Sequence, residues 1–122
     1  PTFCEIAGIA PGDWMQGTSL PKDSDAASER DSVFTEWDSE HNGISISLRT
    51  LYRDDWILTA YGKSSIYEGT EGELYDLQND PLQWRNLWNE PAAAPLKKGL
   101  LDELRETAPL VRTPRLECVA SV

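Results

Sequence analysis

Apolar and polar side chains alternate along much of residues 33–77, with the two-residue period of strands that bury one face. The first alternating run is Val33-Phe34-Thr35-Glu36-Trp37, residues 44–49 and 73–77 alternate as well, and residues 56–61 supply a third strand. Their β-branched and aromatic residues favour strands. The connections between these runs are short and hold no crossover helix, so the pattern predicts an antiparallel sheet of about four strands.

Turn residues separate the expected strands. Residues 38–43 are polar and predict a turn, with Asn42-Gly43 as a strong hairpin signal. The alternation slips near Thr50-Leu51, which indicates a bulge or a change of the buried face. Residues 53–55 predict another turn, and residues 62–72 predict a polar loop before the last strand.

A helical period replaces the strand period after Pro95. The apolar positions recur at three- and four-residue spacing and are Leu96, Leu100, Leu101, Leu104 and Ala108. By the same period we expect the charged side chains to face water, namely Lys97, Lys98, Asp102, Glu103 and Arg105. Gly99 costs such a helix about 1 kcal/mol relative to alanine, so packing has to hold it. Pro109 is expected to end it.

The helix and the sheet offer apolar faces that can pack together. We expect Leu100, Leu101 and Leu104 to be buried against the sheet. The sheet residues expected beneath them are Ile44, Ile46 or Leu48, together with Trp56 or Leu58. A helix laid across one face of a small antiparallel sheet, preceded by a long loop, is an α+β fold.

The stretch from Gly72 to Trp88 predicts a local structural unit. Residues 73–77 read as a strand, and Asn79-Asp80-Pro81 stops it because proline cannot donate to a sheet ladder. Asp80 is placed to cap a helical turn opened by Pro81. On that turn Trp84, Leu87 and Trp88 are spaced to form one apolar face that folds back onto the sheet.

The first part of the chain has little periodicity. Residues 2–8 predict the end of a short helix, with Gly8 as its stop. Residues 9–32 read as a long surface connection pinned by Trp14. Its acidic residues lack the spacing of an EF-hand, so a solvated loop is favoured over a calcium loop: Asp23, Asp25, Glu29 and Asp31.

Composition narrows the classes of partner. The 122 residues include 21 acidic and 11 basic side chains, a net charge of −10. This charge argues against nucleic-acid partners and against anionic membrane surfaces, because the long-range field repels both. No apolar run approaches membrane-spanning length and no targeting leader is visible, so the sequence assigns no compartment.

The two cysteines, Cys4 and Cys118, lie near opposite ends of the chain. Neither has a metal-ligand partner at useful spacing, and two free thiols are the simpler interpretation. A bridge between them would require an oxidising compartment and termini that meet.

Candidate chemistry is sparse. His41 is the sole histidine, and Asp38 or Glu40 could orient it as a base, but a polar turn more often holds a solvated histidine. Arg49 could contact an anion, with an ion pair to a nearby carboxylate as the alternative. His41 and Arg49 are therefore weak substrate-binding candidates, and the sequence predicts no catalytic residue and no metal ligand.

Three stretches resemble type I sulfatases of the alkaline phosphatase superfamily. Gly72-Glu-Leu-Tyr-Asp-Leu-Gln-Asn-Asp-Pro81 with Asn86-Leu87 is similar to the signature near the sulfatase C-terminus. Pro1-Thr2 through Leu20-Pro21 resembles the segment before the C-terminal subdomain, and Ser47 through Trp56 resembles its arginine-containing strand pair. The motifs are long and occur in the family order, and together they span about residues 1 to 90.

The resemblance implies a sulfuric ester hydrolase with a formylglycine nucleophile and a divalent metal, usually calcium. The nucleophile is made from cysteine or serine in a Cys-x-Pro-x-Arg motif, which neither Cys4 nor Cys118 matches. We therefore expect an inactive C-terminal fragment without a cofactor of its own. Its partners would be the missing N-terminal sulfatase domain and, through it, a sulfate ester.

The domain organisation expected from this resemblance has three parts. Residues 1–32 are a helix end and linker from the missing domain, residues 33–108 are the C-terminal subdomain, and residues 109–122 are a tail. A different class remains open, a free-standing module that binds protein or carbohydrate through exposed tryptophans. Phe3, Trp14, Met15 and Trp37 are the apolar residues expected to be exposed in the isolated chain.

Overall fold

A computed structural model describes residues 1–15, 17, 19–20 and 31–107. The chain divides into two compact units, Pro1–Asp31 and a second unit that begins at Ser32. Ala108, Pro109, Cys118 and three of the loop acids, Asp23, Asp25 and Glu29, lie outside the described residues.

The first unit contains one short helix. Helix α1 spans Thr2–Ile6, and Gly8 follows it with a φ of 68°, a left-handed conformation that suits glycine. The Cys4 thiol lies 3.8 Å from the sulfur of Met15 and forms no disulfide. The expectation that Trp14 pins the loop is wrong, because its side chain is 79% exposed.

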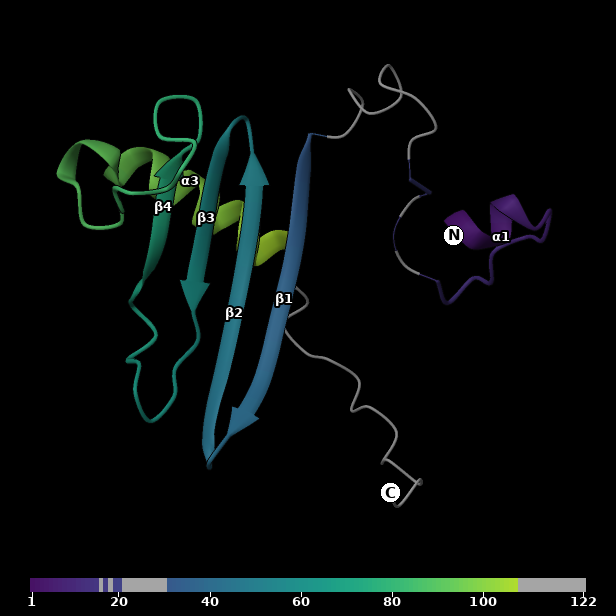
Figure 1. The fold of residues 1–122 in the computed structure, drawn as a ribbon, viewed down its shortest axis with the longest axis horizontal. Helices are drawn as coiled ribbons and strands as arrows, with labels where there is room; N and C mark the ends of the chain where they lie inside the picture. Colours follow the sequence, from purple (N-terminus) through teal and green to yellow (C-terminus); the bar gives the residue numbers. More distant parts are fainter. Residues whose placement is uncertain (16, 18, 21–30, 108–122) are drawn as a thin grey trace. The chain divides into compact units, whose positions relative to one another are not determined.

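The second unit is built on an antiparallel sheet of four strands in the order β1-β2-β3-β4 (Figure 1). The strands are β1 Ser32–His41, β2 Ile44–Arg53, β3 Trp56–Tyr61 and β4 Gly72–Asp76. A 3₁₀ turn, η1 Pro91–Ala93, leads into helix α3 Ala94–Thr107. The predicted α+β fold, with about four antiparallel strands and a C-terminal helix, is confirmed.

The first hairpin is longer than the sequence predicts. Asn42 and Gly43 make the expected two-residue turn with φ values of 52° and 76°. The turn predicted over residues 38–41 is wrong, because β1 continues to His41, which pairs with Ile44. The polar residues of β1 stay in the sheet because β2 supplies partners for them, including an ion pair between Asp38 and Arg49 at 2.8 Å.

No bulge interrupts β2. Thr35 pairs with Thr50 and Phe34 pairs with Leu51 in one continuous register. The alternation changes there because β2 uses both of its faces. Leu51 is buried beneath α3, whereas the earlier apolar residues of β2 point to the opposite side of the sheet.

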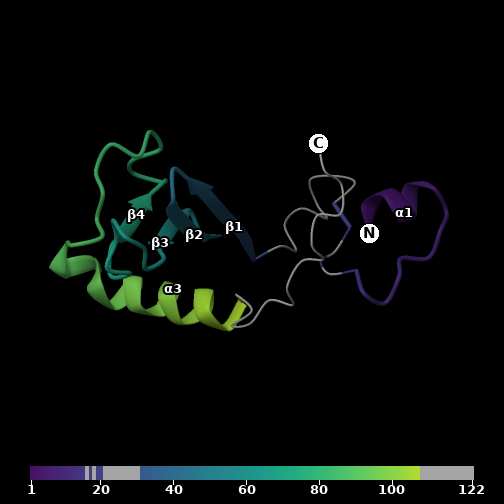
Figure 2. The same cartoon turned by 90° about the horizontal axis from the view of Figure 1, so that it is seen from below.

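The core lies between α3 and one face of the sheet (Figure 2). Leu51, Leu58 and Leu74 stand side by side on neighbouring strands and are fully buried. Leu100 and Leu104 of α3 are buried with them, as predicted. The pairing predicted with Ile44, Ile46 and Leu48 is wrong, because these side chains alternate with Leu51 and face away from the helix.

The connection from β4 to η1 is a turn rather than the predicted helix. Gln83 has a φ of 56°, which interrupts any helical run, and Trp84 is 84% exposed instead of packed on the sheet. Asp80 still accepts backbone N–H groups, from Trp84 at 3.1 Å and Arg85 at 2.8 Å. Trp88 is buried against the core.

Candidate functional site

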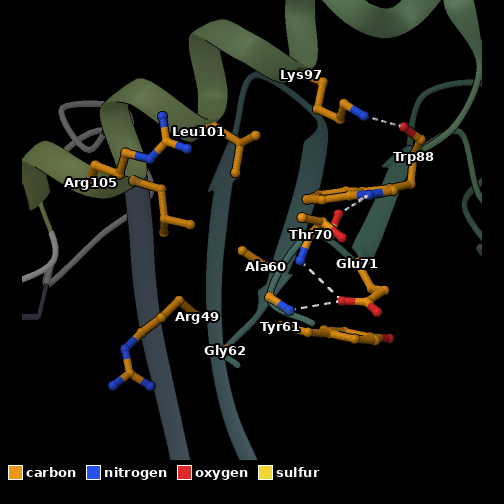
Figure 3. A pocket seen from close by; sticks show the side chains of 12 residues that line it. Arg49, Ala60, Tyr61, Gly62, Thr70, Glu71, Trp88, Lys97, Leu101 and Arg105 are labelled. Atoms are coloured by element: carbon orange, nitrogen blue, oxygen red, sulfur yellow. Dashed lines mark hydrogen bonds between the residues drawn. The ribbon is translucent and has the colours of Figure 1, made fainter. Parts of the chain in front are cut away.

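The second unit contains a cavity of about 560 Å³ beside α3 (Figure 3). Its walls come from β2, from the end of β3, from the loop before β4 and from α3. This volume lies within the range of small-molecule sites, about 300–1,000 Å³. The apolar part of the lining consists of Ala60, Trp88, Leu101 and Leu104.

Trp88 forms one side of the cavity and is fixed at several points. Its indole N–H donates to the carbonyl of Thr70 at 3.0 Å, as Figure 3 shows. A Cβ atom at Gly72 would lie 2.5 Å from the ring, so the ring packs there only because residue 72 is glycine. Its backbone N–H donates to the side-chain oxygen of Asn86 at 2.9 Å.

Asn86 also ties this connection to the edge of the sheet. Its side-chain oxygen accepts the N–H of Leu74 at 3.1 Å, and its amide donates to the carbonyl of Gly72 at 3.2 Å. The N–H of Leu87 donates to the carbonyl of Leu74 at 2.8 Å. The free edge of β4 is thereby paired, and Trp88 is held beside α3.

Lys97 carries a positive charge at the cavity wall. Its ammonium lies 4.7 Å from the centre of the Trp88 ring and donates to the Trp88 carbonyl (Figure 3). No carboxylate of the described residues forms an ion pair with it. The expectation that Lys97 faces water is therefore wrong, because Lys97 is half-buried and its ammonium contacts Trp88.

Arg105 lies two helical turns further along α3 and also lines the cavity. It forms an ion pair with Asp102 at 3.1 Å, and its side chain is 68% exposed. Leu101 lies between Lys97 and Arg105 and points from the helix into the cavity (Figure 3). In the sequence, Lys97, Leu101 and Arg105 could be found only by their i, i+4, i+8 spacing. This spacing is hard to recognise because an amphipathic helix carries other charged residues as well.

Arg49 reaches the cavity from β2, but its guanidinium is turned away from α3 (Figure 3). It forms ion pairs with Glu36 at 2.9 Å and with Asp38 at 2.8 Å. The ion pair that the sequence offered as an alternative to anion contact is present. The aliphatic stem of Arg49 therefore lines the cavity, while its charged guanidinium is bound to carboxylates outside it.

The structure does not bring His41 to this cavity. His41 is the last residue of β1, is exposed beside the Asn42-Gly43 turn, and pairs with Ile44. Asp38, proposed as its orienting partner, binds Arg49 instead. The two weak candidates from the sequence are thus on different parts of the sheet.

A folded loop forms the remaining wall. The carboxylate of Glu71 accepts backbone N–H groups from Glu68 at 3.1 Å, Gly69 at 3.0 Å and Thr70 at 3.0 Å. These hydrogen bonds, led by the one from Glu68, lower the pKa of Glu71 below its ordinary value. The loop is held in shape by its own carboxylate.

The sheet face opposite α3 is the second notable surface, called here the open sheet face. Apolar and aromatic side chains flank a polar row on it, and they include Val33, Trp37, Ile46, Leu48, Tyr52, Ile57, Tyr61 and Tyr75. The hydroxyls of Thr50 and Thr59 lie 2.9 Å apart in the polar row. No other described element of the second unit covers this face (Figure 2).

Tyr61 is joined to the polar row of the open sheet face. Its hydroxyl donates to Glu73 at 2.6 Å. Burial, and then this hydrogen bond, raise the pKa of Tyr61 above its ordinary value. The phenol therefore stays protonated and acts as a donor rather than as a base.

The described residues show neither a metal-binding cluster nor a membrane-spanning helix. No group of three or more His, Cys, Asp or Glu side chains there is placed to hold a metal ion. None of the described helices is both long and apolar enough to cross a membrane.

Comparison with known proteins gives one consistent family. Residues 1–109 match the family model described as N-sulphoglucosamine sulphohydrolase, C-terminal. A curated relative, the Delta 4,5-hexuronate-2-O-sulfatase of Bacteroides thetaiotaomicron, is 30% identical over 109 residues. That match covers 84% of this chain but only 22% of the relative.

Solved structures agree. A 2-O GAG sulfatase is similar at 30% identity and a TM-score of 0.62, over 84% of this chain and 22% of that chain. A structure of a protein in complex with its substrate D-glucosamine-2-N,6-O-disulfate is similar at 24% identity and a TM-score of 0.66, over 88% of this chain and 22% of that chain. This last likeness is one of fold.

Proposed function

The chain belongs to the N-sulphoglucosamine sulphohydrolase C-terminal family, and we propose that it forms the C-terminal part of an enzyme that hydrolyses sulfuric esters. The observation that carries the proposal is the family match over residues 1–109. The chain spans 22% of the length of its curated relative, so the activity belongs to a longer protein in this proposal.

The chemistry of such an enzyme needs groups that this sequence does not supply. A hydrated formylglycine would attack the sulfur, and a divalent ion, usually calcium, would neutralise the ester oxygens. The sequence has no Cys-x-Pro-x-Arg motif, and the described residues have no cluster that fits a metal ion. We assign both groups to the remaining part of the enzyme and expect this chain to be inactive alone.

The partner in this proposal is the N-terminal sulfatase domain. Residues 1–32 would lead from that domain, residues 33–108 would form the subdomain, and residues 109–122 would form a tail. We propose that this domain packs on the open sheet face, because Trp37 on that face is 63% exposed and α3 covers only the other face. Burying such a face against a second domain removes apolar area from water.

The names of the relatives suggest the class of ester. One is named for a hexuronate 2-O-sulfate and another as a GAG sulfatase. We extend this to a proposal that the complete enzyme acts on a sulfated saccharide. Basic groups are needed to hold such a substrate, because the net charge of −10 repels it at long range.

The test compares two proteins, the 122-residue chain and the product of its complete coding region. We expect turnover of a chromogenic aryl sulfate and of a sulfated disaccharide only from the complete product, and loss of turnover when its Cys-x-Pro-x-Arg cysteine is changed to alanine. Turnover by the 122-residue chain alone would overturn the proposal. A complete product without that motif would do the same.

A second candidate function is a free-standing module that binds protein or carbohydrate. Trp84 supports it, because this side chain is 84% exposed on a turn held by Asp80. An exposed tryptophan on a rigid turn can stack on a sugar or a partner surface. A start codon directly before Pro1 in the coding sequence would favour this module over the sulfatase part.

A further inference from the structure

We propose that the cavity between α3 and the sheet binds an anionic saccharide of disaccharide length. The inference rests on the proposed function, because a sulfated saccharide is the ligand that function brings to the protein. It goes further by assigning a binding site to residues of this chain. The first observation is the cavity itself, about 560 Å³ with Ala60, Leu101 and Leu104 in its lining.

The cavity lining includes three basic side chains, Arg49, Lys97 and Arg105, and one carboxylate, that of Glu71, which accepts hydrogen bonds from three backbone N–H groups. The chain has 21 acidic and 11 basic residues, so a basic side chain readily finds a carboxylate. Ion pairs with a carboxylate are formed by Arg49, Arg53, Arg85, Lys98 and Arg105. Lys97 is half-buried and has no carboxylate partner among the described residues, so its ammonium is the basic group of the lining that a ligand anion can pair with there.

The spacing along α3 sets the length of the ligand. Lys97, Leu101 and Arg105 line the cavity at positions i, i+4 and i+8. The two cationic residues are therefore separated by about 12 Å along the helix, with an apolar residue between them. A saccharide with negative groups on two neighbouring rings matches this order, because its C–H faces can pack on Leu101 and Trp88.

The residues that frame the cavity are held in place before any ligand arrives. Trp88 is fixed by hydrogen bonds to Thr70 and Asn86, and the loop before β4 is closed on Glu71. Preorganised groups lose less entropy on binding than mobile ones. Lys97 lies over the Trp88 ring and can exchange its bond to a neutral carbonyl for an ion pair with a ligand anion.

The first test is a titration of the 122-residue chain with a sulfated uronate–glucosamine disaccharide, followed by NMR. We expect shifts at the Trp88 indole N–H and the Leu101 amide. Lys97→Met and Arg105→Met should each weaken binding, Lys97→Met by about tenfold, the loss typical of one charge-assisted hydrogen bond. Lys98→Met is the matched control, because Lys98 is exposed and does not line the cavity.

Several outcomes would overturn the inference. They are the absence of shifts at Trp88 and Leu101, equal binding of the desulfated disaccharide, an equal loss in Lys98→Met, or the same response to inorganic sulfate alone. The desulfated disaccharide tests whether binding requires the sulfate charge, and inorganic sulfate tests whether binding requires the saccharide.

A second measurement separates this inference from the proposed function. In the complete enzyme, Lys97→Met should raise KM for the sulfated disaccharide, whereas Lys98→Met, outside the cavity, should change neither that KM nor the turnover of a small aryl sulfate. If the complete enzyme turns over aryl sulfate but Lys97→Met has an unchanged KM for the sulfated disaccharide, saccharide binding in the cavity is contradicted and the sulfatase proposal stands. Binding by the chain without any turnover by the complete enzyme would contradict the sulfatase proposal alone.

Discussion

Gly72 and Trp88 show how one missing side chain positions the wall of the candidate site. The Cβ of any other residue at position 72 would lie 2.4 Å from the carbonyl oxygen of Thr59 and 2.5 Å from the Trp88 ring. Gly72 is also part of the sequence signature. The structure gives that glycine a physical role, which is the close approach of an indole ring to a strand.

Gly72→Ala is expected to destabilise the fold by about 1–3 kcal/mol, as overpacking does, because backbone and a buried ring must both move. Urea unfolding followed by tryptophan fluorescence measures the change. Gly99→Ala is the matched control, since no atom lies within 4 Å of the added Cβ. It should stabilise α3 by up to about 1 kcal/mol. Equal effects of both changes would contradict this account.

At the scale of elements, α3 and the sheet were predictable, but the face on which they meet was not. Alternation gave the strands because their side-chain period is two, and Asn42-Gly43 gave the first turn. The face was misassigned because Ile44, Ile46 and Leu48 form the most regular apolar row of the chain. Leu51 lies out of phase with that row and is the residue buried beneath α3.

The candidate site was harder to predict than the fold. Lys97 and Arg105 share the helix with other charged residues, and only tertiary packing places them beside Trp88. The sequence places Trp84 and Trp88 on one face of a predicted helical turn, but the left-handed conformation of Gln83 interrupts that turn, and Trp88 is buried while Trp84 is exposed. No short-range sequence pattern predicts the placement of these basic residues beside Trp88 or the burial of Trp88 instead of Trp84.

Leu104→Ala tests the core between α3 and the sheet. Leu104 is 4% exposed, so its truncation should cost about 2–5 kcal/mol in the free energy of unfolding. Ile46→Ala is the comparison, because Ile46 lies on the open sheet face and is only partly buried in the chain alone. Denaturant unfolding should show the larger loss for Leu104→Ala. The reverse order would place the core on the other face.

At the scale of the molecule, no described helix or strand of the second unit covers the open sheet face. Its aromatic residues surround the hydroxyls of Thr50 and Thr59 and the carboxylate of Glu73. A face of this mixed kind resembles the interfaces between domains, which combine apolar contact with satisfied polar groups. The net charge of −10 opposes self-association in the isolated chain.

The isolated chain is expected to associate when salt screens this charge. The open sheet face then has no N-terminal domain packed on it, and the negative charges of two copies no longer repel each other strongly. Light scattering at low and high salt measures the effect. Trp37→Gln should reduce the association. Trp84→Gln should change it less, since Trp84 lies on the β4–η1 turn rather than on this face. A monomer at high salt that binds no hydrophobic dye would contradict the prediction.

The order of the strands also has a consequence for the kinetics of folding. Each strand pairs with the next one in the chain, so the sheet is a meander whose contacts are short in sequence. Such local pairings close small loops and form fast. The ion pair between Arg53 and Glu103, by contrast, joins residues 50 positions apart. We therefore expect the sheet to assemble first and α3 to dock last, so the row of Leu51, Leu58 and Leu74 stays accessible to chaperones until the helix arrives.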